Sequence, residues 1–182
     1  MLTSAPLRRS AVAVVLCCAL LAGAGACGSD SASSAGSASA ASPTGTAEKQ
    51  RLAKTRFVAN AGLAAGATYQ WIVKPYKKGK FKKGANGRTF TVIKAGLAGA
   101  FAYNRLKAAL KNAKGDPLLS RAVAPLAAGV ESLKSLPGKL RKGDGAAAGT
   151  FDKVINSVKD AGKSAGAEVR NKVPSSGQLS VG

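Results

Sequence analysis

The sequence predicts an all-α protein, a small antiparallel bundle of about four helices. Apolar residues recur at steps of three and four in four segments between residues 48 and 173, as on the buried face of a helix. No long segment alternates at the two-residue period of a strand. Asn86-Gly87 is typical of a tight hairpin turn, so two short strands within residues 80–93 remain an alternative to part of the second helix.

The first predicted helix ends at Pro75, because the residue before a proline is pushed out of helical geometry. Its expected core face carries apolar and small residues at steps of four and three: Phe57, Ala61, Ala64, Thr68 and Trp71. Trp71 is therefore expected to belong to the core rather than to form a platform for a ligand.

The second predicted helix spans residues 89–114 and is apolar on two sides. One row holds Phe90, Ile93, Leu97 and Phe101. The other row holds Val92, Gly99, Tyr103, Leu106 and Leu110. A helix apolar on two sides is usually the central one, so we expect both rows to be buried in the bundle rather than inserted into a membrane.

Four glycines in the first two helices predict that these helices pair closely. They are Gly62, Gly66, Gly96 and Gly99. Each costs about 1 kcal/mol in helix propensity, yet the missing side chain allows close backbone approach.

The third predicted helix follows Gly115, with Asp116 as its cap and Pro117 in its first position. Its core stripe is Leu119, Val123, Leu126, Val130 and Leu133. Pro125 is expected to kink it, and Pro137-Gly138 to end it.

A glycine-rich break over residues 143–149 precedes the fourth predicted helix, which Thr150 is expected to cap. Its apolar face is Phe151, Val154, Ile155, Val158 and Ala161. The helical domain is expected to end near residue 173, and residues 174–182 to form a disordered tail.

Residues 1–26 have the three regions of a signal peptide: a basic head with Arg8 and Arg9, an apolar run over residues 11–21, and small residues up to Cys27. The apolar run is too short to span a bilayer comfortably. The arginine pair is compatible with the general secretory route, which we favour, and with twin-arginine export.

The segment Ala24-Gly25-Ala26-Cys27 resembles the lipobox of bacterial lipoproteins, in which a cysteine becomes the lipidated N-terminus. Ala24 departs from the family, which prefers a branched residue there. The small, Ala- and Gly-rich leader resembles those of actinomycete lipoproteins, whereas the mature domain resembles only uncharacterised secreted proteins. The alternative is an ordinary signal peptide cleaved after an Ala-x-Ala-like site.

Cys27 is the only cysteine that the mature chain would keep, because Cys17 and Cys18 lie in the apolar run of the leader. No disulfide framework is therefore expected. Residues 27–47 are expected to form a disordered Ser- and Ala-rich tether, with a reach of about 25 Å if it behaves as a flexible chain.

The chain has 28 Lys and Arg against 8 Asp and Glu, a formal net charge of +20. No acidic residue occurs from Lys49 to Lys114, so the positive charge is concentrated in the first half of the mature domain.

Composition argues against common catalytic sites. The chain has no histidine, and its acids after Lys114 occur singly, so we expect no enzyme, metal site or cofactor. Residues 162–166 match G-x-S-x-G by letter, but that serine-hydrolase motif requires a preceding strand and a histidine. We interpret this match as a helix end rich in small residues.

The segment between the first two helices predicts a flexible cationic loop in which Tyr76 and Phe81 are interspersed among basic residues. Its possible polyanion contacts are Lys74, Lys77, Lys78, Lys80, Lys82, Lys83 and Arg88. The loop could bind anionic lipid, or phosphate-rich polymers through salt-dependent contacts. It could equally be a solvated loop whose two aromatic rings fold back onto the bundle.

The sequence therefore predicts an exported, lipid-anchored protein on the extracytoplasmic face of the cell membrane, with a binding or structural role. Expected partners are anionic lipid headgroups or wall polymer, with no specific nucleic acid. The alternative is an anchored module that docks an acidic exported protein.

Overall fold

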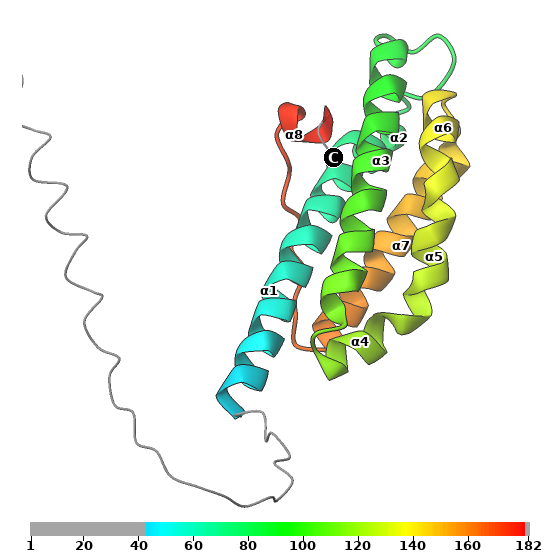
Figure 1. Cartoon of the computed structure of the whole chain (residues 1–182). Helices are drawn as coiled ribbons and strands as arrows, with labels where there is room; N and C mark the ends of the chain where they lie inside the picture. The colour runs from blue at the N-terminus through cyan, green and yellow to red at the C-terminus, as the bar shows by residue number, and fades with distance from the viewer. Residues whose placement is uncertain (1–42, 181–182) are drawn as a thin grey trace, which may run out of the picture. The chain divides into compact units, whose positions relative to one another are not determined.

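The computed structural model describes residues 43–180, which form an all-α bundle with no strand in that range. Four helical arms alternate in direction along the bundle (Figure 1). The arms are α1 with its continuation, then α3, then the run α4–α6, and finally α7. The predicted antiparallel helical bundle is confirmed.

The first arm begins with α1 (Pro43–Thr68), five residues before the predicted start at residue 48. It continues without interruption through the π-helical turn η2 (Tyr69–Val73) and α2 (Lys74–Lys77). The prediction that Pro75 ends the helix is wrong. A proline clashes with the carbonyl four residues earlier in an α-helix, and the wider π turn, in which the Lys74 N–H donates to the Tyr69 carbonyl, accommodates it.

The second arm, α3 (Arg88–Ala113), has the predicted bounds within one residue. No hairpin precedes it: Gly87 adopts a left-handed conformation (φ 70°) directly before its first turn. The row from Val92 to Leu110 is buried or partly buried in the core. The other row is not, since only Phe101 of its four residues is buried.

The third arm is divided into three short helices, α4 (Pro117–Val123), α5 (Ala127–Ser132) and α6 (Leu136–Arg141). The 3₁₀ turns η3 (Ala124–Leu126) and η4 (Leu133–Ser135) join them, and η3 contains Pro125, as the predicted kink requires. Pro137 does not end the arm, because it occupies the first turn of α6, where its missing N–H is tolerated. The predicted core stripe is confirmed.

The fourth arm, α7 (Gly145–Ser164), begins five residues before the predicted cap at Thr150. Asp144 is the actual cap, accepting hydrogen bonds from the N–H groups of Ala146 (2.8 Å) and Ala147 (3.4 Å). The Thr150 hydroxyl instead donates to the Ala146 carbonyl inside the helix. Three consecutive alanines after Gly145 favour the helix enough to include two glycines of the predicted break.

Residues 165–180, after α7, have a defined path, which corrects the predicted disordered tail for residues 174–180. This segment returns in extended form beside α1 and ends in the short helix α8 (Ser176–Ser180), whose Leu179 is buried (Figure 1). The Lys172 N–H donates to the Gly62 carbonyl at 2.8 Å, inside α1.

Gly62 and Gly66 face this returning segment, and not α3 as the glycine pattern predicted. A methyl group on Gly62 would lie 2.8 Å from the Arg170 carbonyl oxygen, and one on Gly66 would overlap the carbonyl of Lys172. Gly96 lies against Arg141, and Gly99 lies against Leu140 and Phe151. Helices α1 and α3 do form the most extensive helix pair, but buried alanines line both of them.

Candidate polyanion-binding surface

The loop between α2 and α3 is held by hydrogen bonds along its own backbone. Successive backbone N–H groups donate back along the chain, from Lys80 to Pro75 (3.0 Å) and from Ala85 to Lys82 (3.2 Å). Three glycines in the loop have left-handed backbone, with φ of 68° at residue 79, 81° at residue 84 and 70° at residue 87. Glycine adopts this geometry without steric cost, so the glycine spacing sets the path of the loop.

Two aromatic rings hold the base of the loop against the bundle. Phe81 is buried in the core cluster, and Tyr76 contacts it edge to face with ring centroids 5.9 Å apart. The Tyr76 ring also occupies the space beside Gly145, where any side chain would collide with it. Phe81 therefore belongs to the core, whereas Tyr76 packs on it and is still 43% exposed.

Arg88 has a structural role beside the loop, in addition to its predicted role as a polyanion contact. Its Nε donates to the Phe81 carbonyl at 2.9 Å, and one terminal nitrogen donates to the Lys142 carbonyl at 3.0 Å. The side chain thus ties the loop to the connection between α6 and α7. Hydrogen bonds to an ionised donor are stronger than neutral ones, so this tie is well suited to hold the loop in place.

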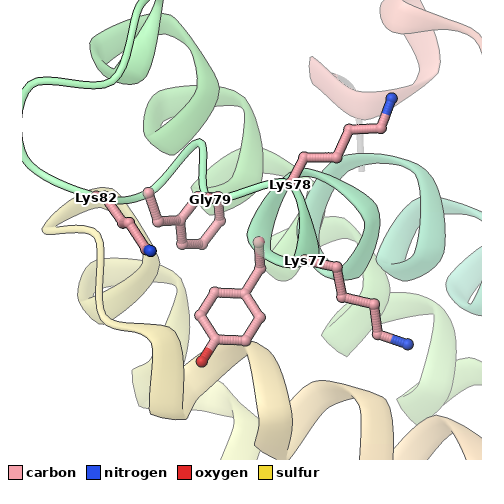
Figure 2. Close-up of a pocket in the computed structure, with 6 residues that line it drawn as sticks. Lys77, Lys78, Gly79 and Lys82 are labelled. Atoms are coloured by element: carbon pink, nitrogen blue, oxygen red, sulfur yellow. The ribbon is translucent and has the colours of Figure 1, made fainter.

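The remaining six predicted contacts are exposed lysines: Lys74, Lys77, Lys78, Lys80, Lys82 and Lys83. Three of them line a hollow of about 500 Å³ together with Tyr76, Gly79 and Phe81. Their amino groups point outward in different directions (Figure 2). This arrangement suits a broad anionic surface or a chain with many charges better than a single small anion.

Three further exposed basic residues lie on α6 and just after it: Lys139, Arg141 and Lys142. The side chain of Arg141 lies against Gly96 of α3. The Lys142 carbonyl accepts from Arg88, so this segment and the loop are neighbours. The acid beside them, Asp144, caps α7 and keeps its negative charge. The six lysines of α2 and the loop and these three residues are called the cationic cluster below.

Several acids of the described chain have structural partners. Asp116 is buried, accepts from the Leu119 N–H at 2.8 Å as predicted for a cap, and lies 3.6 Å from the Lys54 ammonium. Glu131 accepts from the Tyr103 hydroxyl at 3.0 Å. Within residues 43–180 no three His, Cys, Asp or Glu side chains lie close enough together to hold a metal ion.

Ser164, the serine of the G-x-S-x-G match, is the last residue of α7. Its hydroxyl donates to the Asp160 carbonyl one turn earlier, at 3.0 Å. The segment before it is a helix, so the strand-to-helix turn that exposes a hydrolase nucleophile is not formed here.

A second, polar cavity of about 280 Å³ lies between η2, α7 and the returning C-terminal segment. Its lining includes Thr68, Lys77, Asp152, Lys159 and Asn171, and Lys159 donates to Asn171 at 3.3 Å. The Thr68 hydroxyl is buried and has no hydrogen-bond partner in the described protein. The sequence placed Thr68 on the core face but did not indicate this cavity.

The outer row of α3 contradicts the prediction that it is buried. Phe90 is 69% exposed, Ile93 49% and Leu97 36%, whereas Phe101 is 1% exposed. The Lys94 ammonium lies 5.4 Å from the Phe90 ring centroid and 5.5 Å from that of Trp71. Trp71 itself packs partly buried against the core, as predicted.

Cys27 and the leader lie outside the described residues. Among the helices of residues 43–180, none is both long and apolar enough to cross a bilayer. Comparisons of the chain with protein-family models, with curated proteins and with solved structures found no match.

Proposed function

We propose that the protein is a non-enzymatic envelope lipoprotein whose cationic cluster binds anionic material of the cell envelope, either lipid headgroups or a phosphate-rich wall polymer. The observation that carries this proposal is the cluster itself. It comprises six exposed lysines of α2 and the following loop, together with three exposed basic residues of α6 and the connection after it, against one nearby acid, Asp144.

The charge distribution supports the same proposal. The chain carries a net charge of +20, and no acid occurs in the sequence from Lys49 to Lys114. The acids that the fold brings near the cluster are Asp144 and, beside Lys77, Asp152. A fixed positive surface attracts polyanions over a distance and releases their counterions on contact, so binding weakens as salt rises.

The membrane attachment is part of the proposal. Cys27 follows a leader with the regions of a signal peptide, and its lipidation would place the domain on the extracytoplasmic face of the cell membrane. Two or three acyl chains give stable anchoring, which a single chain does not. The cationic cluster would then meet headgroups and wall polymers at high local concentration.

Neutralising the loop lysines tests polyanion binding. In one variant Lys77, Lys78, Lys80, Lys82 and Lys83 are each replaced by Gln, and affinity for long-chain inorganic polyphosphate is measured by fluorescence anisotropy between about 50 and 200 mM salt. We expect affinity at low salt to fall by at least about tenfold, and the dependence on salt to become shallower.

The matched control replaces five exposed lysines elsewhere by Gln: Lys49, Lys111, Lys134, Lys153 and Lys163. Both variants lose the same charge, so a cluster-specific site predicts a much smaller loss for the control. Equal losses would mean that total charge alone attracts polyanions. Binding that saturates with one acidic exported protein, and not with polyphosphate, would favour the docking alternative.

The anchor is tested by partition of the exported protein between membrane and supernatant, for the natural chain and for Cys27→Ala. We expect the natural chain to stay with the membrane at high salt and Cys27→Ala to be released, because only the acyl chains resist salt. If both proteins leave with salt, the lipobox interpretation is wrong and the charge alone holds them.

A further inference from the structure

We infer that the first turns of α3 insert Phe90, Ile93 and Leu97 into the interface of an anionic lipid bilayer, with the cationic cluster on the headgroups around them. This inference rests on the proposed function and chooses lipid as the anionic partner. It adds an apolar contact to a surface that so far carries only charge.

The exposed residues form one stripe on α3. Positions 90, 93 and 97 are separated by three and four residues, so their side chains lie on the same side of the helix. Val92, Ala95 and Gly96 in the same turns are buried. The exposure therefore follows one face of an ordered helix.

The stripe is exposed near the N-terminus of α3, and the residue that continues it along the helix is buried. Phe90 is the most exposed of the large apolar side chains of the described chain, and exposure decreases through Ile93 and Leu97 until Phe101 is buried. The apolar surface is thus concentrated where α3 emerges from the cationic loop. An exposed aromatic residue at such an end is typical of proteins that dip into the interfacial region of a bilayer.

The lysines near the stripe favour anionic lipid as its partner. Lys94 lies on the same face, 5.4 Å from the Phe90 ring, and Lys82 and Lys83 belong to the loop that leads into α3. Apolar side chains bordered by lysines match anionic lipid, which offers both a hydrocarbon layer and negative headgroups. A second copy of this chain would bring the same lysines against these, so like charges would oppose a dimer through the stripe.

The insertion also predicts how contact should respond to salt. Headgroup attraction is screened as ionic strength rises, whereas burial of apolar side chains is not. Lipid binding through charge alone would therefore vanish at high salt. Binding that also uses the stripe would keep a salt-resistant fraction on anionic vesicles.

The test uses the chain carrying Cys27→Ala throughout, so that no acyl chain contributes. One variant replaces Phe90 and Ile93 by Ser, and the matched control replaces Leu52 and Leu118 by Ser. The two pairs are similarly exposed, at 69% and 49% against 47% and 62%, and the control pair lies on α1 and α4. Far-UV circular dichroism checks that both variants keep their helix content.

Flotation is measured with vesicles of phosphatidylcholine alone and of phosphatidylcholine with about a third phosphatidylglycerol, at low and at high salt. We expect the Phe90 and Ile93 variant to lose at least about tenfold in high-salt binding to anionic vesicles, with the control pair unchanged. Its affinity for polyphosphate should equal that of the parent, since its lysines are intact.

A direct probe of insertion places the only tryptophan on the stripe, as Phe90→Trp in a Trp71→Phe background, with Leu118→Trp in the same background as control. We expect a blue shift and quenching by brominated lipid at residue 90 and not at residue 118. Equal high-salt binding of parent and serine variant, or no quenching at residue 90, would overturn insertion. If the stripe instead mediates a dimer, the parent would show twice the monomer mass and the serine variant would not.

These outcomes separate the inference from the proposed function. If the parent protein binds polyphosphate but does not insert residue 90 into vesicles, the cationic cluster remains a polyanion site and the apolar contact is ruled out. If the parent protein binds neither polyphosphate nor anionic vesicles, the proposed function is overturned as well.

Discussion

The hydroxyl of Thr68 is buried at 1% exposure beside the π turn, with no partner in the described protein. A buried hydroxyl without a hydrogen bond costs free energy that a methyl group of the same shape does not. We therefore expect Thr68→Val to raise the free energy of unfolding by about 1 kcal/mol, measured by urea denaturation. The control Thr55→Val removes an exposed hydroxyl that donates to the Arg51 carbonyl, and little change is expected there. A large destabilisation by Thr68→Val would show that the hydroxyl is in fact satisfied in solution.

Local capping chemistry was predictable at the scale of single residues where one candidate stood alone. Asp116 follows a glycine stop and precedes a proline, and it caps α4 as expected. At α7 the predicted cap, Thr150, was wrong, and Asp144 caps the helix instead. Either residue is a good cap, so the choice depended on whether Gly145 and Gly149 could be helical, which packing decides.

Among the elements, the extended segment after α7 depends on the small residues of α1. A methyl group on Gly66 would overlap the Lys172 carbonyl, which cannot move without breaking the nearby bond from the Lys172 N–H to Gly62. We expect Gly66→Ala to lower the free energy of unfolding by about 2 kcal/mol and to speed hydrogen exchange at Lys172.

The matched control is Gly149→Ala in α7, where a methyl group would meet no atom within 4 Å. The gain in helix propensity should stabilise the protein there by about 0.5 to 1 kcal/mol. If Gly66→Ala were equally stabilising, the close approach of the returning segment to α1 would be wrong.

The elements differ in how far their patterns predicted them. The bounds of α3 and the core faces of the helices follow from apolar periodicity, which depends only on neighbours in the sequence. The π turn at Pro75, the capture of the C-terminal segment and the tie from Arg88 depend on partners distant in the sequence. The spacing of glycines on a helix indicates that another segment can approach closely. It does not indicate whether that segment is a helix or an extended chain.

For the whole molecule, the all-α bundle was predictable, and so was the position of the cationic loop between its first two arms. What could not be predicted was which apolar row of α3 would face outward. Both rows have the spacing of a buried face. Only the completed bundle shows that the other arms cover one row and, of the second row, bury only Phe101. The exposed stripe is therefore a property of the assembled fold.

The positions of the two ends of the bundle bear on how the molecule would be oriented on a membrane. Helix α1 begins at the end opposite the cationic loop (Figure 1) and, with 26 residues, measures about 39 Å. If the tether predicted from the sequence between Cys27 and Pro43 behaves as a flexible chain, its typical reach would be about 20 Å, less than this axis. A molecule acylated at Cys27 and inserted at Phe90 would therefore lie along the membrane plane rather than stand upright on it. Lengthening that linker would free the bundle to rise, so linker length would set the orientation of the protein on the cell surface.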